Sequence, residues 1–183
     1  MSAEASNIGL THLPLDSYIL PAPAGLSFAD WLAHPGCIAW QVVFSHLTVL
    51  DAGSPCYCPV PNWSKRSEPW VSAGGITPGK GQMLRPAALG YLVEGTQAFA
   101  FRGEVAARLY VASPDAIVAE RLTGVPRTPS AAAEVLRRRL ASNLPLLRAQ
   151  RGEADLVIDG TAPRAAQIAA LRALMARLRL DAT

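Results

Sequence analysis

Short apolar stretches, most of them ending at an acidic residue, recur along this chain and alternate with segments of helical spacing. The stretches are residues 8–15 before Asp16, Ala88–Val93 before Glu94, Arg108–Ala112, and Asp155–Asp159. Short apolar runs of this kind are typical of parallel strands buried on both faces. Strands that alternate with helices favour right-handed βαβ units. The sequence therefore predicts an α/β fold with a mostly parallel sheet flanked by helices, as a single domain over residues 1–183.

The expected helices lie between these stretches. They are Ser27–Leu50 with a break at His34-Pro35-Gly36, Pro114–Leu122 behind a Ser113 cap, Ser130–Arg148 with an interruption at Pro145, and Ala162–Leu180. Proline removes a backbone donor and clashes with the preceding turn, which explains the two breaks. Residues 52–86 are dense in Gly, Pro, Ser and Asn, so we expect a long irregular excursion there. Excursions of that length are usually lids or binding loops.

Composition narrows the class of protein. Half of the residues are hydrophobic and 17% are charged, as in ordinary globular proteins. Apolar runs stay short of the roughly 18 residues needed to span a membrane, and the N-terminus lacks a signal-peptide layout. We therefore expect a cytoplasmic protein with no membrane partner and no nucleic-acid partner. The formal charge of +3 comes almost wholly from arginine, which suits phosphate groups or a solvated helix face.

The cysteines favour neither a disulfide framework nor a zinc site. Cys37, Cys56 and Cys58 are odd in number, and a Cys-x-Cys pair is poorly placed to bridge to itself. Pro55-Cys56-Tyr57-Cys58 is one residue shorter than the Pro-Cys-x-x-Cys of zinc deaminases, and no His-x-Glu accompanies it. A Ser/His/Asp hydrolase is equally unsupported, because the chain has no Gly-x-Ser-x-Gly turn.

A series of landmarks runs through residues 10–160. In order, they are LPLDSYILP at 13–21, DWLAHPGCIAW at 30–40, LDAGSP at 50–55, PVPNWSKRSEP at 59–69, LVEG at 92–95, and ARLYVASPDAIVAERL at 107–122. This succession resembles the uridine kinase and phosphoribulokinase family of P-loop kinases. The resemblance implies a three-layer kinase-like domain, and a protein that transfers phosphate from ATP, with Mg²⁺, to a nucleoside or another small hydroxyl compound.

The resemblance also assigns roles to particular residues. Asp16 matches the carboxylate that orients or deprotonates the substrate hydroxyl, and the arginines Arg121 and Arg127 match lid residues that stabilise the transferred charge. Glu94 matches an acidic residue that assists Mg²⁺ or meets the substrate. Tyr18, His34 and Asn62 complete the expected substrate side. Each also has an ordinary structural explanation: Asp16 could cap its turn, and His34 could serve packing.

The family's phosphate loop is the part that the sequence does not supply. In the family a strand, a Gly-x-x-x-x-Gly-Lys-Ser/Thr loop and a helix precede the strand that matches residues 8–15, and that first strand is central in the sheet. Only 15 residues precede Asp16 here, so the first βα unit is expected to be missing. Gly74–Gly81 fits Gly-x₄-Gly-Lys with Lys80 as a weak phosphate ligand, but Gly81 stands where Ser or Thr should be.

Three hypotheses follow from the sequence. The first is a divergent or truncated uridine kinase-like enzyme. The second is a catalytically inactive kinase-like binding or interaction protein, in which a second copy or another protein covers the incomplete sheet. The third is that Met1 lies inside a longer gene that encodes an ordinary kinase.

Overall fold

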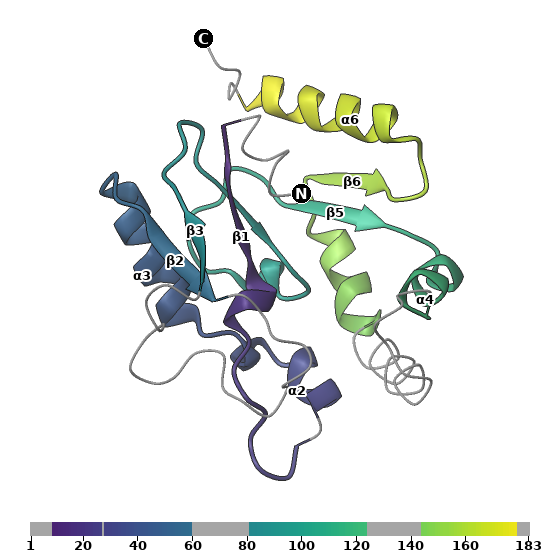
Figure 1. Cartoon of the computed structure of the whole chain (residues 1–183). Helices are drawn as coiled ribbons and strands as arrows, with labels where there is room; N and C mark the ends of the chain where they lie inside the picture. Colours follow the sequence, from purple (N-terminus) through teal and green to yellow (C-terminus); the bar gives the residue numbers. More distant parts are fainter. Residues whose placement is uncertain (1–8, 27, 60–80, 124–143, 179–183) are drawn as a thin grey trace. The chain divides into compact units, whose positions relative to one another are not determined.

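The structure is a computed structural model, and it describes residues 9–26, 28–59, 81–123 and 144–178 (Figure 1). The chain divides into two compact units, Met1–Phe101 and Arg102–Thr183, and each is described by itself. Both units combine short strands with helices. The predicted mixed α/β class is therefore confirmed for the described residues, whereas the single kinase-like domain over 1–183 stays a prediction.

The first unit contains one parallel and one antiparallel pair of strands. β1 (Thr11–Pro14) runs parallel to β4 (Tyr91–Glu94), with Pro14 beside Glu94 at the carboxyl ends. β2 (Cys56–Pro59) and β3 (Gly81–Leu84) form an antiparallel pair, with Cys56 beside Leu84 and Pro59 beside Gly81. The single mostly parallel sheet predicted from the sequence is thus wrong in detail, because the described strands form separate two-stranded sheets.

The two helices of the first unit are separated at the position where the sequence predicts a break. α2 (Phe28–Ala33) and α3 (Trp40–Asp51) are separated by a short 3₁₀ turn, η2 (Pro35–Cys37). His34 caps this turn, since its Nδ1 accepts a hydrogen bond from the Gly36 amide at 3.0 Å. Two more 3₁₀ turns follow strands: η1 (Leu15–Tyr18) after β1, and η3 (Ala98–Ala100) after β4.

The second unit is a parallel strand pair with helices. β5 (Leu109–Ala112) runs beside β6 (Leu156–Asp159) in the register Leu109 to Leu156. α4 (Asp115–Thr123) follows β5, a further helix covers residues 144–152, and α6 (Arg164–Arg177) packs against β6 (Figure 1). Strand, helix, strand and helix in this order match the βαβ unit that the sequence predicted.

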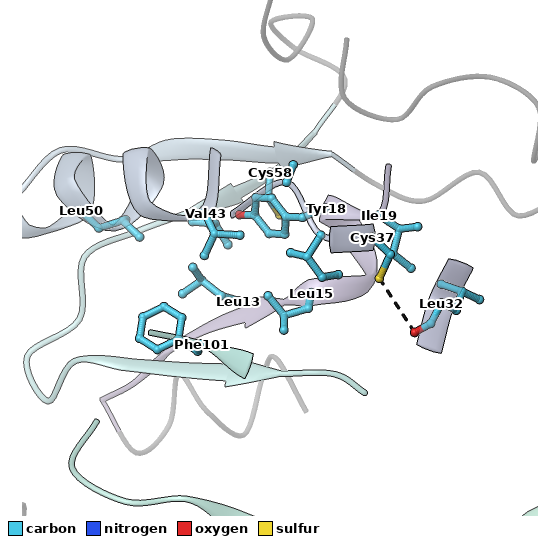
Figure 2. Packing of buried hydrophobic residues seen from close by; sticks show 13 residues of the cluster. Leu13, Leu15, Tyr18, Ile19, Leu32, Cys37, Val43, Leu50, Cys58 and Phe101 are labelled. Carbon is cyan, nitrogen blue, oxygen red and sulfur yellow. Dashed lines mark hydrogen bonds between the residues drawn. The ribbon is translucent and has the colours of Figure 1, made fainter. Parts of the chain in front are cut away.

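One hydrophobic core fills the first unit (Figure 2). Leu13 and Leu15 enter it from β1 and η1, and Val43 and Leu50 enter it from α3. Tyr18 and Cys58 lie at its centre with no exposed surface, and the Cys37 thiol faces the Leu32 carbonyl at 3.9 Å. Apolar side chains from helices and strands converge here, which is the main source of stability for a unit with such small sheets.

Three sequence-based boundaries are corrected. The excursion at 52–86 is not wholly irregular, because its two ends form β2 and β3. Cys58 and Leu84 are buried while Tyr57 and Met83 are exposed, and this alternation stabilises the pair. The strand predicted at Ala88–Val93 begins only at Tyr91, after a turn at Gly90 whose φ is 104°. The helix predicted to end at Arg148 continues to residue 152, and the interruption predicted at Pro145 stays a prediction because residues 124–143 lie outside the described part of the chain.

Candidate functional site

The carboxyl ends of β1 and β4 bring two predicted site residues to the same edge. Glu94 is the last residue of β4 and lies beside Pro14, and half-buried Asp16 follows two residues later in η1. Parallel strands end at a common edge, and ligands of open α/β sheets bind there. The structure therefore places Asp16 and Glu94 at one end of one strand pair, as their positions at strand ends predicted.

Gly95 allows the chain to turn tightly at this edge. Its φ is 148°, which side chains on L-residues rarely permit. A Cβ atom at this position would lie only 2.9 Å from the Cβ of Leu15, the residue before Asp16. The Gly95 backbone thus lies close against the Leu15 side chain, and this close approach requires glycine.

Glu94 has a neighbour that the sequence did not reveal. The His12 Nε2 lies 3.5 Å from a Glu94 carboxylate oxygen, and the His12 side chain is only 8% exposed against 42% for Glu94. His12 and Glu94 lie on the same face of the parallel pair, since the register places His12 beside Leu92 and Pro14 beside Glu94. The imidazole therefore lies next to the Glu94 carboxylate, and the two groups form an ion pair when His12 is protonated.

Tyr18 is part of the core. Its ring is fully buried, and its hydroxyl forms a 2.8 Å hydrogen bond with the Nδ1 of His46 on α3. The Cys58 thiol also makes side-chain hydrogen bonds with Ser17 and Tyr18. Burial raises the pKa of the tyrosine hydroxyl and lowers the pKa of His46, so burial favours the neutral form of both groups. In this structure Tyr18 joins η1 to α3 in the core, and its substrate role stays a prediction.

The protein is expected to lose stability as pH falls below about 6.5, because of the half-buried His46. Its pKa is lowered by burial, so the unfolded chain binds the proton more tightly than the folded one. The stability contributed by neutral His46 is complete above the unfolded pKa of about 6.5 and is lost as pH falls through the lower folded pKa. Urea unfolding at pH 7.5 and 5.5 measures this loss.

A His46→Gln variant should show a flatter dependence of the urea midpoint on pH. The matched control is His34→Gln, because the His34 ring is exposed. If His46→Gln kept the full pH dependence, His46 would not be the group responsible.

His34 is occupied by local contacts. Besides capping η2, its ring stacks on Trp31 with ring centroids 5.7 Å apart. Trp31 in turn donates from its indole nitrogen to the Leu20 carbonyl at 2.9 Å. A hydrogen bond from the Leu20 amide to the Cys37 carbonyl joins the chain after η1 to η2. These contacts explain why His34 and Pro35 occur here, and a substrate role for His34 stays a prediction.

For the remaining predicted residues, a place beside Asp16 and Glu94 stays a prediction. Arg121 lies in α4 of the second unit. Asn62, Lys80 and Arg127 lie outside the described residues. In the described part of the chain, no group of three or more His, Cys, Asp or Glu side chains could hold a metal ion by itself. Cys37, Cys56 and Cys58 form no disulfide bond with one another.

His12 and His46 are the polar residues that sequence reasoning missed. His12 is the second residue of a four-residue strand and stands between Thr11 and Leu13, so the alternation of strand faces could have singled it out. The partner of His46 could not be found in this way, since Tyr18 lies 28 positions away. Only the packing of α3 on η1 brings the two together.

Comparison with known proteins adds no relative to these observations. No protein-family model and no curated protein sequence matches the chain. Among the described helices, none is both long and apolar enough to cross a membrane.

Proposed function

We propose that the chain is a divergent uridine kinase-like protein that binds a small hydroxyl compound, such as a nucleoside, at the carboxyl edge of β1 and β4. One observation carries the proposal: the parallel register places Glu94 beside Pro14, two residues before Asp16. Two carboxylates at one strand edge suit the hydroxyl groups of a sugar-like ligand, which donate hydrogen bonds to them. The order of landmarks along the sequence supports the kinase assignment.

In this proposal the two carboxylates have different tasks. Asp16 orients the attacking hydroxyl or takes its proton, which is the role that phosphoryl transfer leaves to a side chain. Glu94, held by His12 at 3.5 Å, binds a neighbouring hydroxyl or a water molecule on Mg²⁺. Arg121 and Arg127 would neutralise charge on the phosphoryl group.

The carboxylates fit Mg²⁺ that is bound mainly through nucleotide phosphates. Mg²⁺ commonly takes only one or two protein carboxylates and keeps several waters, so Asp16 and Glu94 provide enough protein ligands. When bound, the Mg²⁺ complex of ATP would supply the phosphoryl group. We assign Lys80 to the binding of the ATP phosphates.

Calorimetric titration of the full chain with ATP and excess Mg²⁺ tests the enzyme assignment. We expect saturable heat at nucleotide concentrations up to about 1 mM, since typical Michaelis constants lie at or below this value. The same titration without Mg²⁺ is the control, and it should give weaker binding. Absence of heat at millimolar Mg²⁺ and ATP would overturn the kinase proposal.

A second candidate is a kinase-like binding protein without catalysis. It is favoured by the small sheets, because parallel strands normally belong to larger sheets covered on both faces. A second copy or another protein would then cover the free strand edges. Light scattering at micromolar concentration separates the cases: a dimer or a complex supports this candidate, and a well-folded monomer contradicts it.

A further inference from the structure

A hollow lies at the opposite end of β1 from Asp16. Its volume is about 350 Å³, and its walls are residues 9–12 and 82–88. The Thr11 hydroxyl donates a hydrogen bond to the Arg85 carbonyl and so joins the two walls. The Thr11 amide also donates to the Gly90 carbonyl at 2.9 Å, which fixes the first wall to the turn before β4. The hollow is therefore framed by backbone on both sides, and its volume is within the range of small-ligand sites.

The side chains around this hollow favour a negatively charged ligand. Arg85 lines it and carries positive charge, and no carboxylate is among the described residues that line it. Arg85 is exposed, so its guanidinium is accessible to a ligand from solution. A guanidinium matches the paired oxygens of a carboxylate or a phosphate.

The rest of the lining combines apolar side chains with polar groups, among them Thr11 and Gln82. Met83, Leu84 and Pro86 stand beside Arg85 on one wall, and Leu10 stands beside His12 on the other. Apolar walls with a few polar groups are the usual composition of small-molecule sites. The ligand that fits this combination has an oxyanion at one end and a short apolar part.

We propose that this hollow binds a small organic oxyanion, a carboxylate or a phosphate compound, through Arg85. The site is separate from the carboxyl edge, and it does not depend on the kinase proposal. The Nε2 of His12 is buried at 3.5 Å from Glu94, so the proposal gives the His12 imidazole no contact with the ligand.

The proposal is tested by titrating the full chain, in separate experiments, with inorganic phosphate, butyrate and acetate at constant ionic strength. Backbone amide signals of Gly9 and Gly90 in the NMR spectrum report on the two sides of the first wall. We expect saturable shifts below about 20 mM for phosphate or for butyrate, and whichever binds more tightly identifies the oxyanion. Butyrate should bind more tightly than acetate, because each buried methylene adds about 0.8 kcal/mol.

Arg85→Gln is the decisive variant. It should weaken binding about tenfold, since a hydrogen bond to a charged group contributes about 1.5–3 kcal/mol. Arg85 is exposed, so the fold should be kept. The matched control Arg102→Gln removes an exposed arginine outside the hollow and should leave binding unchanged. Lack of saturation with every anion, or equal binding by Arg85→Gln and the unaltered chain, would overturn the proposal. Neither result depends on Mg²⁺ or ATP, so failure here is distinct from failure of the kinase assignment.

Discussion

Replacing Asp16 with asparagine is expected to lower phosphoryl transfer to the hydroxyl acceptor by about 10²–10⁴-fold, while the Mg²⁺ complex of ATP still binds. Asparagine keeps the size of the side chain but cannot take a proton from the acceptor. Asp16 is half-buried in η1 and lies directly after the strand that pairs with β4. The loss should therefore appear in kcat rather than in nucleotide affinity. A coupled assay of ADP release with a panel of nucleosides, beside a nucleotide titration of the variant, measures both quantities.

Asp30→Asn provides the control for this substitution. Asp30 is an exposed carboxylate in the first turn of α2, and the proposal gives it no role in the reaction. It should retain the activity of the unaltered chain. If Asp16→Asn transferred phosphate as fast as this control, Asp16 would not be the acceptor's base or orienting group, and the site at the carboxyl edge would have to be abandoned.

The second large effect is on stability, and it concerns the same edge. Gly95→Ala is expected to destabilise the first unit by roughly 3–5 kcal/mol, because two penalties combine. The residue keeps a φ of 148° that alanine tolerates poorly, and the new methyl group would stand 2.9 Å from the Leu15 Cβ. Urea unfolding followed by circular dichroism at pH 7.5 gives the change in free energy.

Gly90→Ala separates the two penalties. Gly90 also has a positive φ, 104°, but a Cβ there would have no neighbour within 4 Å. It should therefore show only the conformational penalty of about 1–3 kcal/mol. Equal destabilisation by the two substitutions would show that the close approach to Leu15 contributes nothing, and that the strand ends are held by other contacts.

The sequence predicted the elements best where local patterns determine them. The helix break at His34-Pro35-Gly36 follows from the chemistry of proline, and it is confirmed by η2 between α2 and α3. The apolar stretches before Asp16 and Glu94 form neighbouring parallel strands. Short apolar runs of this kind are typical of buried parallel strands, so the sequence could predict them. The positions of these two carboxylates at one edge then followed from topology alone.

The parts that the sequence did not predict depend on contacts between distant residues. The β2–β3 pair joins segments with 21 residues between them, and neither strand has a regular polar and apolar alternation. The Tyr18–His46 and His12–Glu94 pairs arise only when α3 packs on η1 and when β1 meets β4. The resemblance implies a substrate role for Tyr18, which stays a prediction, whereas the burial of its ring follows only from packing in the core.

The β2–β3 ladder ends at Pro59 and Gly81, which are partners roughly 5 Å apart. The entropy of closing a chain segment between two such positions changes slowly with its length, so exchanging the 21 residues 60–80 for about five alters it by only about 1.3 kcal/mol. The ladder is therefore expected to tolerate a change in the length of the chain between its two strands.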